Sequence, residues 1–163
     1  MITLRGATES DGAALAAIDA VTQSAAVSPA PPRTAEDGFF RPGLVPEDVL
    51  VAELDQTVVG YAVVGQTIPL PSHSHVLELR GLAVDPRHQQ QGIGRALVEA
   101  AVALATERGA RKLCLRVLAT NPSAERLYAA LGFVVEGVLR EEFLLDDAYV
   151  DDVLMARGLT GDT

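Results

Sequence analysis

Residues 78–95 read ELRGLAVDPRHQQQGIGR, and this stretch decides the fold that we predict. Its apolar residues predict a β-strand over about residues 75–84, which an Asp-Pro pair ends. A polar loop follows, and then Gly92 and Gly94 open an amphipathic helix. Unpaired backbone N–H groups and the positive end of the helix dipole meet at such a turn, so we expect it to bind an anion.

The chain before this stretch predicts a strand, a helix, an irregular segment and a hairpin. Residues 2–4 are β-prone, and Ser10 or Asp11 can cap the helix that follows. The apolar stripe of that helix consists of Ala14, Leu15, Ile18 and Val21. Five of the nine prolines fall in residues 27–46, which we expect to form an irregular, lid-like segment. A hairpin then joins residues 49–54 and 58–64 across Asp55, Gln56 and Thr57.

The chain after the glycines predicts two helices and three strands. The first helix ends at Gly109, and its stripe consists of Ile93, Leu97, Ala100, Ala101, Leu104 and Arg108. A strand at residues 112–117 precedes a second helix, which Asn121 caps and Gly132 ends. Residues 133–143 and 148–157 form a closing antiparallel pair. This order predicts an α/β fold with a mixed sheet between helices.

The composition fits one domain over residues 1–163. Apolar residues make up 48% and charged residues 21%, and no segment is apolar and long enough to span a bilayer. We see no signal peptide at the start of the sequence and therefore expect a cytoplasmic protein. The formal charge of −9 argues against general binding of nucleic acid or an anionic membrane, so any phosphate must be held by local geometry.

We consider three alternative interpretations of the turn at Gly92 and Gly94. A dinucleotide-binding fingerprint would need a third glycine where Leu97 stands, and a shorter loop after the strand. A P-loop would need Lys and Ser or Thr after the last glycine, where Arg95 and Ala96 stand. A tight helix entrance without a ligand remains the simplest alternative.

Two motifs carry a resemblance to a known family. Residues 89–94 match QxxGxG after a strand that ends LAVDP, and residues 121–133 read NPSAERLYAALGF. In this order and spacing they resemble motif A and the second signature of the Gcn5-related N-acetyltransferase (GNAT) superfamily, and the resemblance extends over nearly the whole chain. It implies a single-domain fold with a mixed, mostly antiparallel sheet of about six to seven strands. Helices would cover both faces, and the two central parallel strands would splay apart. Gln90 departs from the pattern, because many members carry glycine there.

The resemblance also implies a binding site for acetyl-CoA. The pantetheine arm would lie along the strand edge formed by Leu82, Ala83 and Val84, and Asn121 would reach it, although an N-cap role also explains that asparagine. The pyrophosphate would bind the loop and helix start formed by Gln89, Gln90, Gln91, Gly92, Ile93, Gly94 and Arg95. Arg87, His88 and Arg95 would add positive charge, unless they are simply solvated.

Acetyl transfer to an amine needs a base, a stabilised carbonyl oxygen and a protonated leaving thiol. Glu78 matches the family's strand-borne base, and even spacing would place it on the same face as Leu82 and Val84. The alternative is an ion pair with Arg80 or with a lysine on the solvent edge of the sheet. Tyr128 matches the tyrosine that protonates the thiolate, or it packs in the helix core. A backbone N–H of Leu82 or Val84 would polarise the carbonyl.

Cys114 and the histidines suggest no further chemistry. Cys114 is the single cysteine and lies in a strand with no histidine near it in sequence, so we expect a structural thiol and direct attack by the amine in a ternary complex. His73 and His75 have no evident third partner, and we predict no metal site.

Six acids near the closing hairpin suggest the acceptor. They are Glu141, Glu142, Asp146, Asp147, Asp151 and Asp152. They would attract a cationic primary amine, such as a small-molecule amine, a polyamine, an amino acid or a protein N-terminus, or they form a solvated hairpin. An acetyl-CoA sensor and an amine- or peptide-binding module without turnover stay open as alternative functions. A homodimer is the family's common arrangement.

Overall fold

The computed structural model describes residues 1–160 and contains one seven-stranded sheet in the order β1-β2-β3-β4-β5-β7-β6. The strands are β1 Ile2–Gly6, β2 Val49–Leu54, β3 Thr57–Gly65, β4 Val76–Val84, β5 Lys112–Leu118, β6 Val134–Leu145 and β7 Ala148–Gly158. The helices are α1 Gly12–Thr22, α2 Ile93–Glu107 and α3 Pro122–Ala130. β4 and β5 are parallel, and the other neighbouring strands are antiparallel. The predicted fold class is confirmed.

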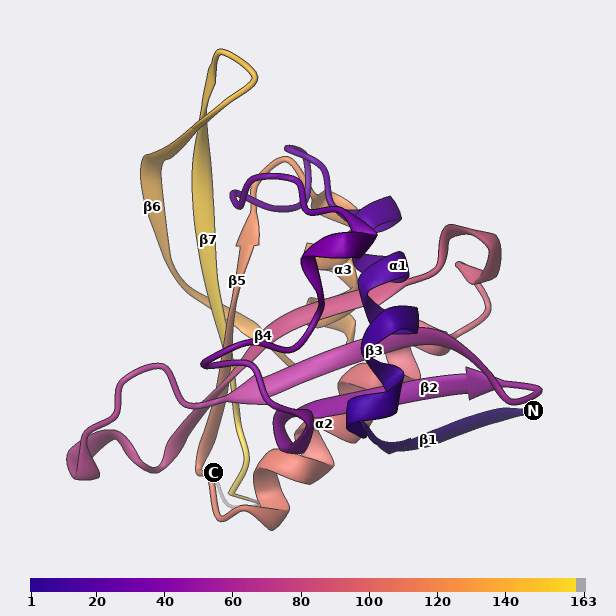
Figure 1. Ribbon diagram of the computed structural model, residues 1–163. Coiled ribbons are helices and arrows are strands. Elements are labelled where there is room, and N and C mark those ends of the chain that lie inside the picture. Colours follow the sequence, from indigo (N-terminus) through magenta and orange to yellow (C-terminus); the bar gives the residue numbers. More distant parts are fainter. Residues whose placement is uncertain (161–163) are drawn as a thin grey trace.

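Helices cover both faces of the sheet (Figure 1). α2 and α3 contribute to one core, in which Leu97, Leu113 and Phe133 are buried. α1 closes the other face with Leu15 and Ile18. The predicted stripe of α1 was partly wrong, because Ala14 and Val21 are exposed and Ala16 is buried instead. No helix within residues 1–160 is long and apolar enough to cross a membrane.

The parallel strands β4 and β5 pair over a short stretch and then diverge. Their register joins Val76 to Lys112, Leu77 to Leu113 and Glu78 to Cys114. Both strands continue, to Val84 and Leu118, without pairing to each other. Figure 1 shows β5 turning away from β4 beyond the paired stretch. The predicted splay is therefore present, and it leaves one edge of β4 free.

A β-bulge in β4 changes which side chains share a face. The register with β3 shifts at Arg80, which has no partner residue. Side chains alternate between the two faces of a strand. One extra residue therefore moves every later side chain to the face opposite the one it would otherwise occupy. Leu79 and, beyond the bulge, Leu82 and Val84 accordingly pack against the same core. Our prediction that Glu78 shares a face with Leu82 and Val84 was wrong, because it assumed an unbroken strand.

Two-residue turns close both predicted hairpins. Asp55 and Gln56 join β2 to β3, and both have positive φ (50° and 66°). Asp146 and Asp147 join β6 to β7 in the same way (φ 49° and 63°). This is the backbone of a type I′ turn, which matches the twist of the flanking strands. Thr57, predicted in the first turn, is the first residue of β3.

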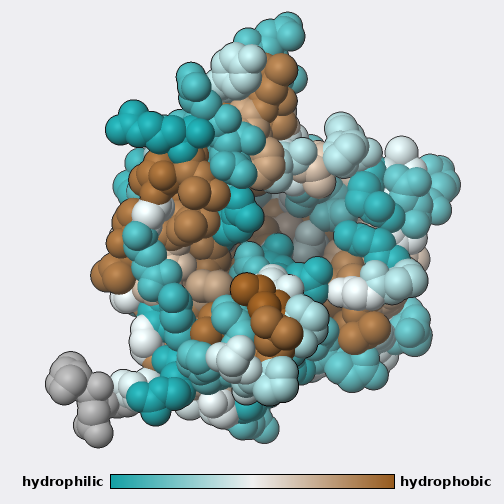
Figure 2. Space-filling model, turned by 90° about the vertical axis from the view of Figure 1, so that its left-hand side faces the viewer, coloured by the Kyte–Doolittle hydropathy of each residue, from teal (hydrophilic) through white to brown (hydrophobic). Residues whose placement is uncertain are grey.

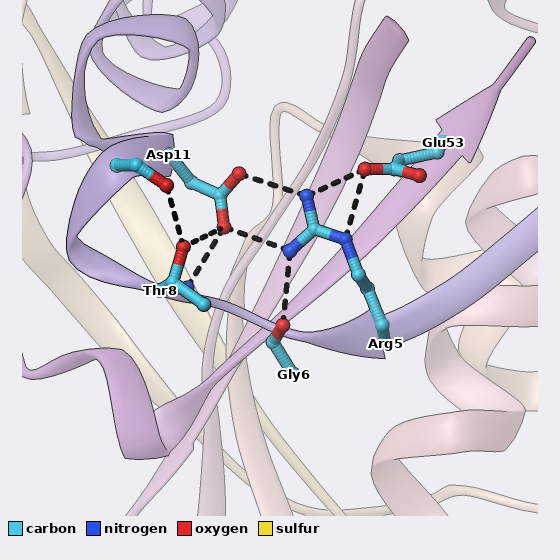
Figure 3. A network of polar contacts seen from close by, with 6 residues as sticks. Arg5, Gly6, Thr8, Asp11 and Glu53 are labelled. Atoms are coloured by element: carbon cyan, nitrogen blue, oxygen red, sulfur yellow. Dashed lines mark hydrogen bonds and ion pairs between the residues drawn. The ribbon is translucent and has the colours of Figure 1, made fainter. Parts of the chain in front are cut away.

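An arginine on β1 fixes the start of α1 (Figure 3). The Arg5 guanidinium donates two hydrogen bonds of 2.8 Å to the Asp11 carboxylate and binds the Glu53 carboxylate of β2. Asp11 also accepts the Thr8 backbone N–H at 2.8 Å and is the N-cap of α1. The hydrogen bonds from Arg5 lower the pKa of Asp11 to about 2. The network therefore ties the first helix to the sheet edge.

Candidate active site

A cleft of about 770 Å³ opens where β4 and β5 diverge. Figure 2 shows the face of the molecule on which the β6–β7 hairpin projects upward above a hollow. The lining includes most of the residues predicted from sequence: Glu78, Leu82, Ala83, Val84, Gln89, Gln90, Ile93, Gly94, Asn121 and Tyr128. Gln91, Gly92 and Arg95 belong to the same loop and helix start but do not line the cleft. One cavity thus brings the glycine loop, the free strand edge and both candidate catalytic residues together.

The glycine loop presents a row of free donors. Within the described residues 1–160, the backbone N–H groups of residues 90–95 donate no hydrogen bond, and the first helical bond runs from Ala96 N–H to the Gly92 carbonyl at 3.0 Å. Gln90 and Gly92 have positive φ (63° and 81°), which turns the backbone at the helix entrance. Successive free N–H groups beside a helix N-terminus form an anion-binding concavity. The positive φ of Gln90 also explains why glycine suits this position.

The arginine side chains of this loop and helix start form ion pairs with acidic side chains of the protein. Arg87 binds Asp85 at 2.7 Å, and its hydrogen bonds lower the pKa of Asp85 to about 2. Arg95 pairs with Glu99 at 3.2 Å on the exposed side of α2. His88 lines the cleft. Anion binding by this loop therefore depends mainly on the backbone N–H groups.

The free edge of β4 directs backbone groups into the cleft. The Asp85 N–H donates to the Val59 carbonyl of β3 at 2.8 Å. Because hydrogen-bonding directions alternate along a strand, the N–H groups of Leu82 and Val84 point the other way, toward the diverging β5. The Gln89 side chain donates to the Val84 carbonyl from that side at 3.2 Å. Two N–H groups are thereby available to a ligand in the cleft.

Glu78 lies at the vertex of the splay, where it is partly buried. Burial raises the pKa of its carboxyl, the nearby Arg116 and Arg80 oppose that rise, and the Asp152 carboxylate adds to it. A carboxylate with a raised pKa is a better proton acceptor near neutral pH than an ordinary glutamate. The environment of Glu78 therefore suits a general base.

An ion pair that we did not predict from the sequence lies near Glu78. Arg116 of β5 donates from Nε to Asp152 of β7 at 2.5 Å, and both residues line the cleft. Asp152 is 2% exposed, and the guanidinium carbon of Arg116 lies 6.0 Å from the centre of the Phe143 ring. The one signal in the sequence was Arg116, the single charged residue after Lys112 in this strand. Alternation places its side chain on the face opposite that of the buried Leu113 and Leu115.

Tyr128 packs at the cleft from α3. It is 8% exposed and meets the Phe133 ring edge-on, with centroids 5.9 Å apart. Burial raises the pKa of its hydroxyl to about 12. That hydroxyl makes no hydrogen bond within the described chain, so it is available to a ligand. The packing and the accessible hydroxyl are compatible, so both predicted roles fit the geometry.

Asn121 caps α3 and lines the same cleft. Its Oδ1 accepts the Ala124 backbone N–H at 3.4 Å. The side-chain amide donor is not used by this cap, so a ligand contact is compatible with capping.

Cys114 and the histidines offer no second chemistry in the described part of the chain. Burial, followed by the nearby Glu78 carboxylate, raises the pKa of the half-buried Cys114 thiol, which opposes thiolate formation. The rings of His73 and His75 lie 6.3 Å apart. Residues 1–160 contain no group of three or more His, Cys, Asp or Glu side chains placed to hold a metal ion.

Comparison with known proteins gives consistent matches. The acetyltransferase (GNAT) family matches residues 15–133. The alanine N-acetyltransferase of ribosomal protein bS18 from Escherichia coli (strain K12) is 40% identical over 78 residues, which are 48% of this chain and 53% of that protein. The match thus spans about half the length of this curated relative. The resemblance predicted from the sequence motifs is confirmed.

Two further matches cover more of the chain. The L-amino acid N-acetyltransferase AaaT of Escherichia coli (strain K12) is 31% identical over 118 residues, 72% of this chain and 70% of that protein. The crystal structure of smu.2055 from Streptococcus mutans UA159 superposes with a TM-score of 0.84 at 25% identity, and it covers 97% of this chain and 99% of that one.

Proposed function

Because the chain belongs to the acetyltransferase (GNAT) family, we propose that it transfers an acetyl group from acetyl-CoA to a primary amine. The observation that carries this proposal is the splay between β4 and β5, with free backbone donors at one end and Glu78 at its vertex. Tyr128 lines the same cleft. The catalytic and binding roles below are part of the proposal.

The residues around the cleft fit acetyl-CoA. Its pyrophosphate would accept hydrogen bonds from the free N–H groups of residues 90–95. The pantetheine arm would pair with the free edge of β4 at Leu82, Ala83 and Val84, much as another strand would. The free amide donor of Asn121 would meet the same arm. This arrangement would place the acetyl group near Glu78 and Tyr128.

The proposed reaction forms one C–N bond and breaks one C–S bond. Acetyl-CoA supplies the acetyl group as a thioester. Glu78, directly or through water, accepts one proton from the substrate ammonium, and the neutral amine that results attacks the thioester carbonyl. The N–H of Leu82 or Val84 donates to the carbonyl oxygen as it gains negative charge. Tyr128 donates its hydroxyl proton to the leaving sulfur and is reprotonated by the second proton that the nitrogen loses once the C–N bond has formed. Its pKa of about 12 keeps the hydroxyl protonated at neutral pH.

Thiol release tests this proposal directly. We expect free CoA thiol to accumulate when the protein, acetyl-CoA and a suitable amine are mixed, with acetylated amine formed in equal amount. A panel should contain amino acids, spermidine and a peptide with a free N-terminus. If the protein binds CoA tightly and releases no thiol with any amine, it acts as an acetyl-CoA sensor. If it binds amines but not CoA, it is an amine-binding module, and the enzyme proposal fails.

The acidic hairpin supports a cationic amino group on the acceptor. Glu141, Glu142, Asp146 and Asp147 are exposed, whereas Asp152 is buried in the cleft beside Arg116. Asp146 and Asp147 also form the hairpin turn. The acids would therefore attract an ammonium group over a distance, but they do not by themselves form a pocket. A cationic acceptor remains a prediction.

A homodimer and a cytoplasmic location also remain predictions. β6 is an edge strand of the sheet and exposes the apolar side chains of Val134, Val135 and Val138. Figure 2 shows apolar surface beside the hairpin. Such an edge supports pairing with a second copy. Light scattering would measure the mass in solution, and a monomer at high concentration would contradict the dimer.

A further inference from the structure

A second, smaller cavity collects three arginines. It has a volume of about 250 Å³ and lies between α1, β3, β4 and the irregular segment that follows α1. Arg33 and Arg41 reach it from the irregular segment, and Arg80 reaches it from the bulge of β4. These three residues are distant in the sequence, and the fold brings them to one place. A cluster of positive charge is unexpected in a protein with a formal charge of −9.

None of these arginines has an anionic partner in the described chain. Arg33 donates to the carbonyls of Asp37 and Gly38 at 3.2 Å, Arg41 donates to the Phe39 carbonyl at 2.9 Å, and Arg80 donates to the Gly43 carbonyl at 3.0 Å. No salt bridge within residues 1–160 includes any of the three. A guanidinium has five N–H donors, so each retains donors for a ligand.

Among the described residues, one carboxylate lines the cavity, and it is already hydrogen-bonded. Asp19 of α1 accepts the hydroxyl of Tyr61 at 2.6 Å. Burial and then this hydrogen bond raise the pKa of Tyr61, so the phenol stays protonated. Three guanidinium groups against one carboxylate leave the cavity net positive. Arginine is also the side chain that best recognises a carboxylate, because its planar fork can bind both oxygens.

The arginine cavity adjoins the cleft. Gln23, Ser28, Arg80 and Gly81 line both of them. Glu78, the proposed base, lies two residues before Arg80 on β4. A small molecule whose amine lies beside Glu78 can therefore extend past the bulge toward the arginines. Phe39, Leu44 and Val63 add apolar surface to the lining.

We propose that the acceptor of the acetyl group carries a carboxylate next to its amine, as a free amino acid does, and that Arg80, Arg41 and Arg33 bind that carboxylate. This inference rests on the proposed acetyl transfer and narrows its substrate class. A polyamine would place positive charge among the arginines, and a peptide N-terminus would place a neutral amide there. Both would forgo the charge-assisted hydrogen bonds that the cavity offers.

Matched pairs of substrates test this inference. The twenty L-amino acids and their C-terminal amides differ in the carboxylate and retain the amine. We expect kcat/KM to be about 10- to 100-fold higher for the best acid than for its amide, since a charged hydrogen bond contributes on that scale. The amine of the amide is less basic, so a larger fraction of it is neutral and able to attack at neutral pH. Without binding of the carboxylate, the amide would therefore react faster. A preference for the acid therefore reports binding of the carboxylate.

Variants of the arginines test whether the preference for the acid over the amide arises in the arginine cavity. Arg80→Gln and, independently, Arg41→Gln should each reduce the ratio of acid to amide at least about threefold, mainly through KM. The control is Arg140→Gln, which changes an exposed arginine of β6 outside both cavities and should keep the ratio unchanged. A loss of folding would lower both rates, but it would not alter their ratio.

The outcomes separate this inference from the proposed function. Thiol release that is fastest with spermidine, with the peptide or with the amides would overturn the carboxylate proposal and leave the enzyme proposal intact. A ratio that stays the same in both arginine variants would also overturn it. Absence of thiol release with every amine would refute the acetyltransferase proposal itself.

Discussion

Glu78 of β4 and Cys114 of β5 are the last two residues at which these parallel strands pair. The candidate base therefore stands where the two backbones separate, and the cleft begins at its side chain. The position is partly buried, which raises the pKa of the carboxyl. Strand divergence thus creates both the space for a thioester and the environment of the proposed base.

Glu78→Gln should lower acetyl transfer about 100-fold or more, which is the range expected when a general base is lost. The wild-type rate should fall as the pH drops through the raised pKa of Glu78, because only the carboxylate accepts a proton. The variant should lack this step and depend on the amine's own deprotonation. Rates measured from pH 5 to 9 check this prediction. The control is Glu107→Gln, an exposed change at the end of α2 and outside the cleft. A pH profile of Glu78→Gln identical to that of the wild type would count against the base.

Tyr128→Phe should reduce kcat about tenfold or more and leave CoA affinity unchanged, because it removes a proton donor and keeps the ring. The hydroxyl makes no hydrogen bond within residues 1–160, so stability should change by less than about 0.5 kcal/mol. Steady-state kinetics and calorimetric CoA binding measure the two effects. Tyr149→Phe, at an exposed position, is the matched control. Full activity in Tyr128→Phe would remove this residue from the mechanism.

Gly92→Ala and Gly109→Ala form a matched pair at the two ends of α2. Both glycines have nearly the same positive φ (81° and 82°), and an added Cβ meets no atom within 4 Å at either place. Each change should therefore cost a similar free energy of unfolding, about 1–2 kcal/mol. CoA affinity should fall about tenfold or more in Gly92→Ala alone, because this change distorts the loop that we propose to bind the phosphates. Equal CoA affinity in the two variants would place the phosphates elsewhere.

Gln90→Gly should stabilise the protein. Gln90 adopts a φ of 63°, a left-handed conformation that costs a residue with a Cβ roughly 1 kcal/mol. We expect a gain of up to about 1 kcal/mol in the free energy of unfolding, reduced by the greater freedom of glycine in the unfolded chain. Gln91→Gly is the control, since Gln91 lacks a positive φ and should lose stability. Chemical denaturation measures the free energy of unfolding of both variants. If both variants are less stable than the wild type, Gln90 is not strained.

Local sequence signals predicted the elements and most of the cleft. The glycines, the Asn-Pro helix start and the β-branched runs act within a few residues, so their structures followed from the sequence. The bulge at Arg80 has one local signal in the sequence, which is Gly81 inside a strand. An added Cβ on Gly81 would lie 3.4 Å from the Val63 side chain, which is ordinary packing contact, so the space around Gly81 does not itself require glycine.

Long-range register explains what the sequence did not predict. Arg116 meets Asp152 because β5 pairs with β7 in one particular register, and no pattern within either strand encodes that alignment. The cavity of Arg33, Arg41 and Arg80 depends on the path of an irregular segment across β4. Side chains that meet only through tertiary structure carry no shared signal in a single sequence.

Asp11→Asn should destabilise the protein in a pH-dependent way. The pKa of Asp11 is lowered from 3.8 to about 2 in the folded chain, so its carboxylate stabilises the fold above about pH 4. That contribution is lost as the pH falls from about 4 to about 2, where both states bind the proton. At pH 7 we expect the free energy of unfolding of the variant to be about 1–2 kcal/mol lower than that of the wild type, allowing for screening by solvent.

The difference in the free energy of unfolding between Asp11→Asn and the wild type should therefore become smaller toward pH 2. Thermal unfolding at pH 7, 4 and 2.5 measures it, and Asp147→Asn in the exposed hairpin turn is the control. Arg5 would lose its bidentate partner in the variant, and the start of α1 would loosen. Because Thr22, at the other end of α1, lines the cleft, a smaller loss of activity should accompany the loss of stability. A constant difference in the free energy of unfolding at all three pH values would show that the charge of Asp11 does not cause the loss of stability.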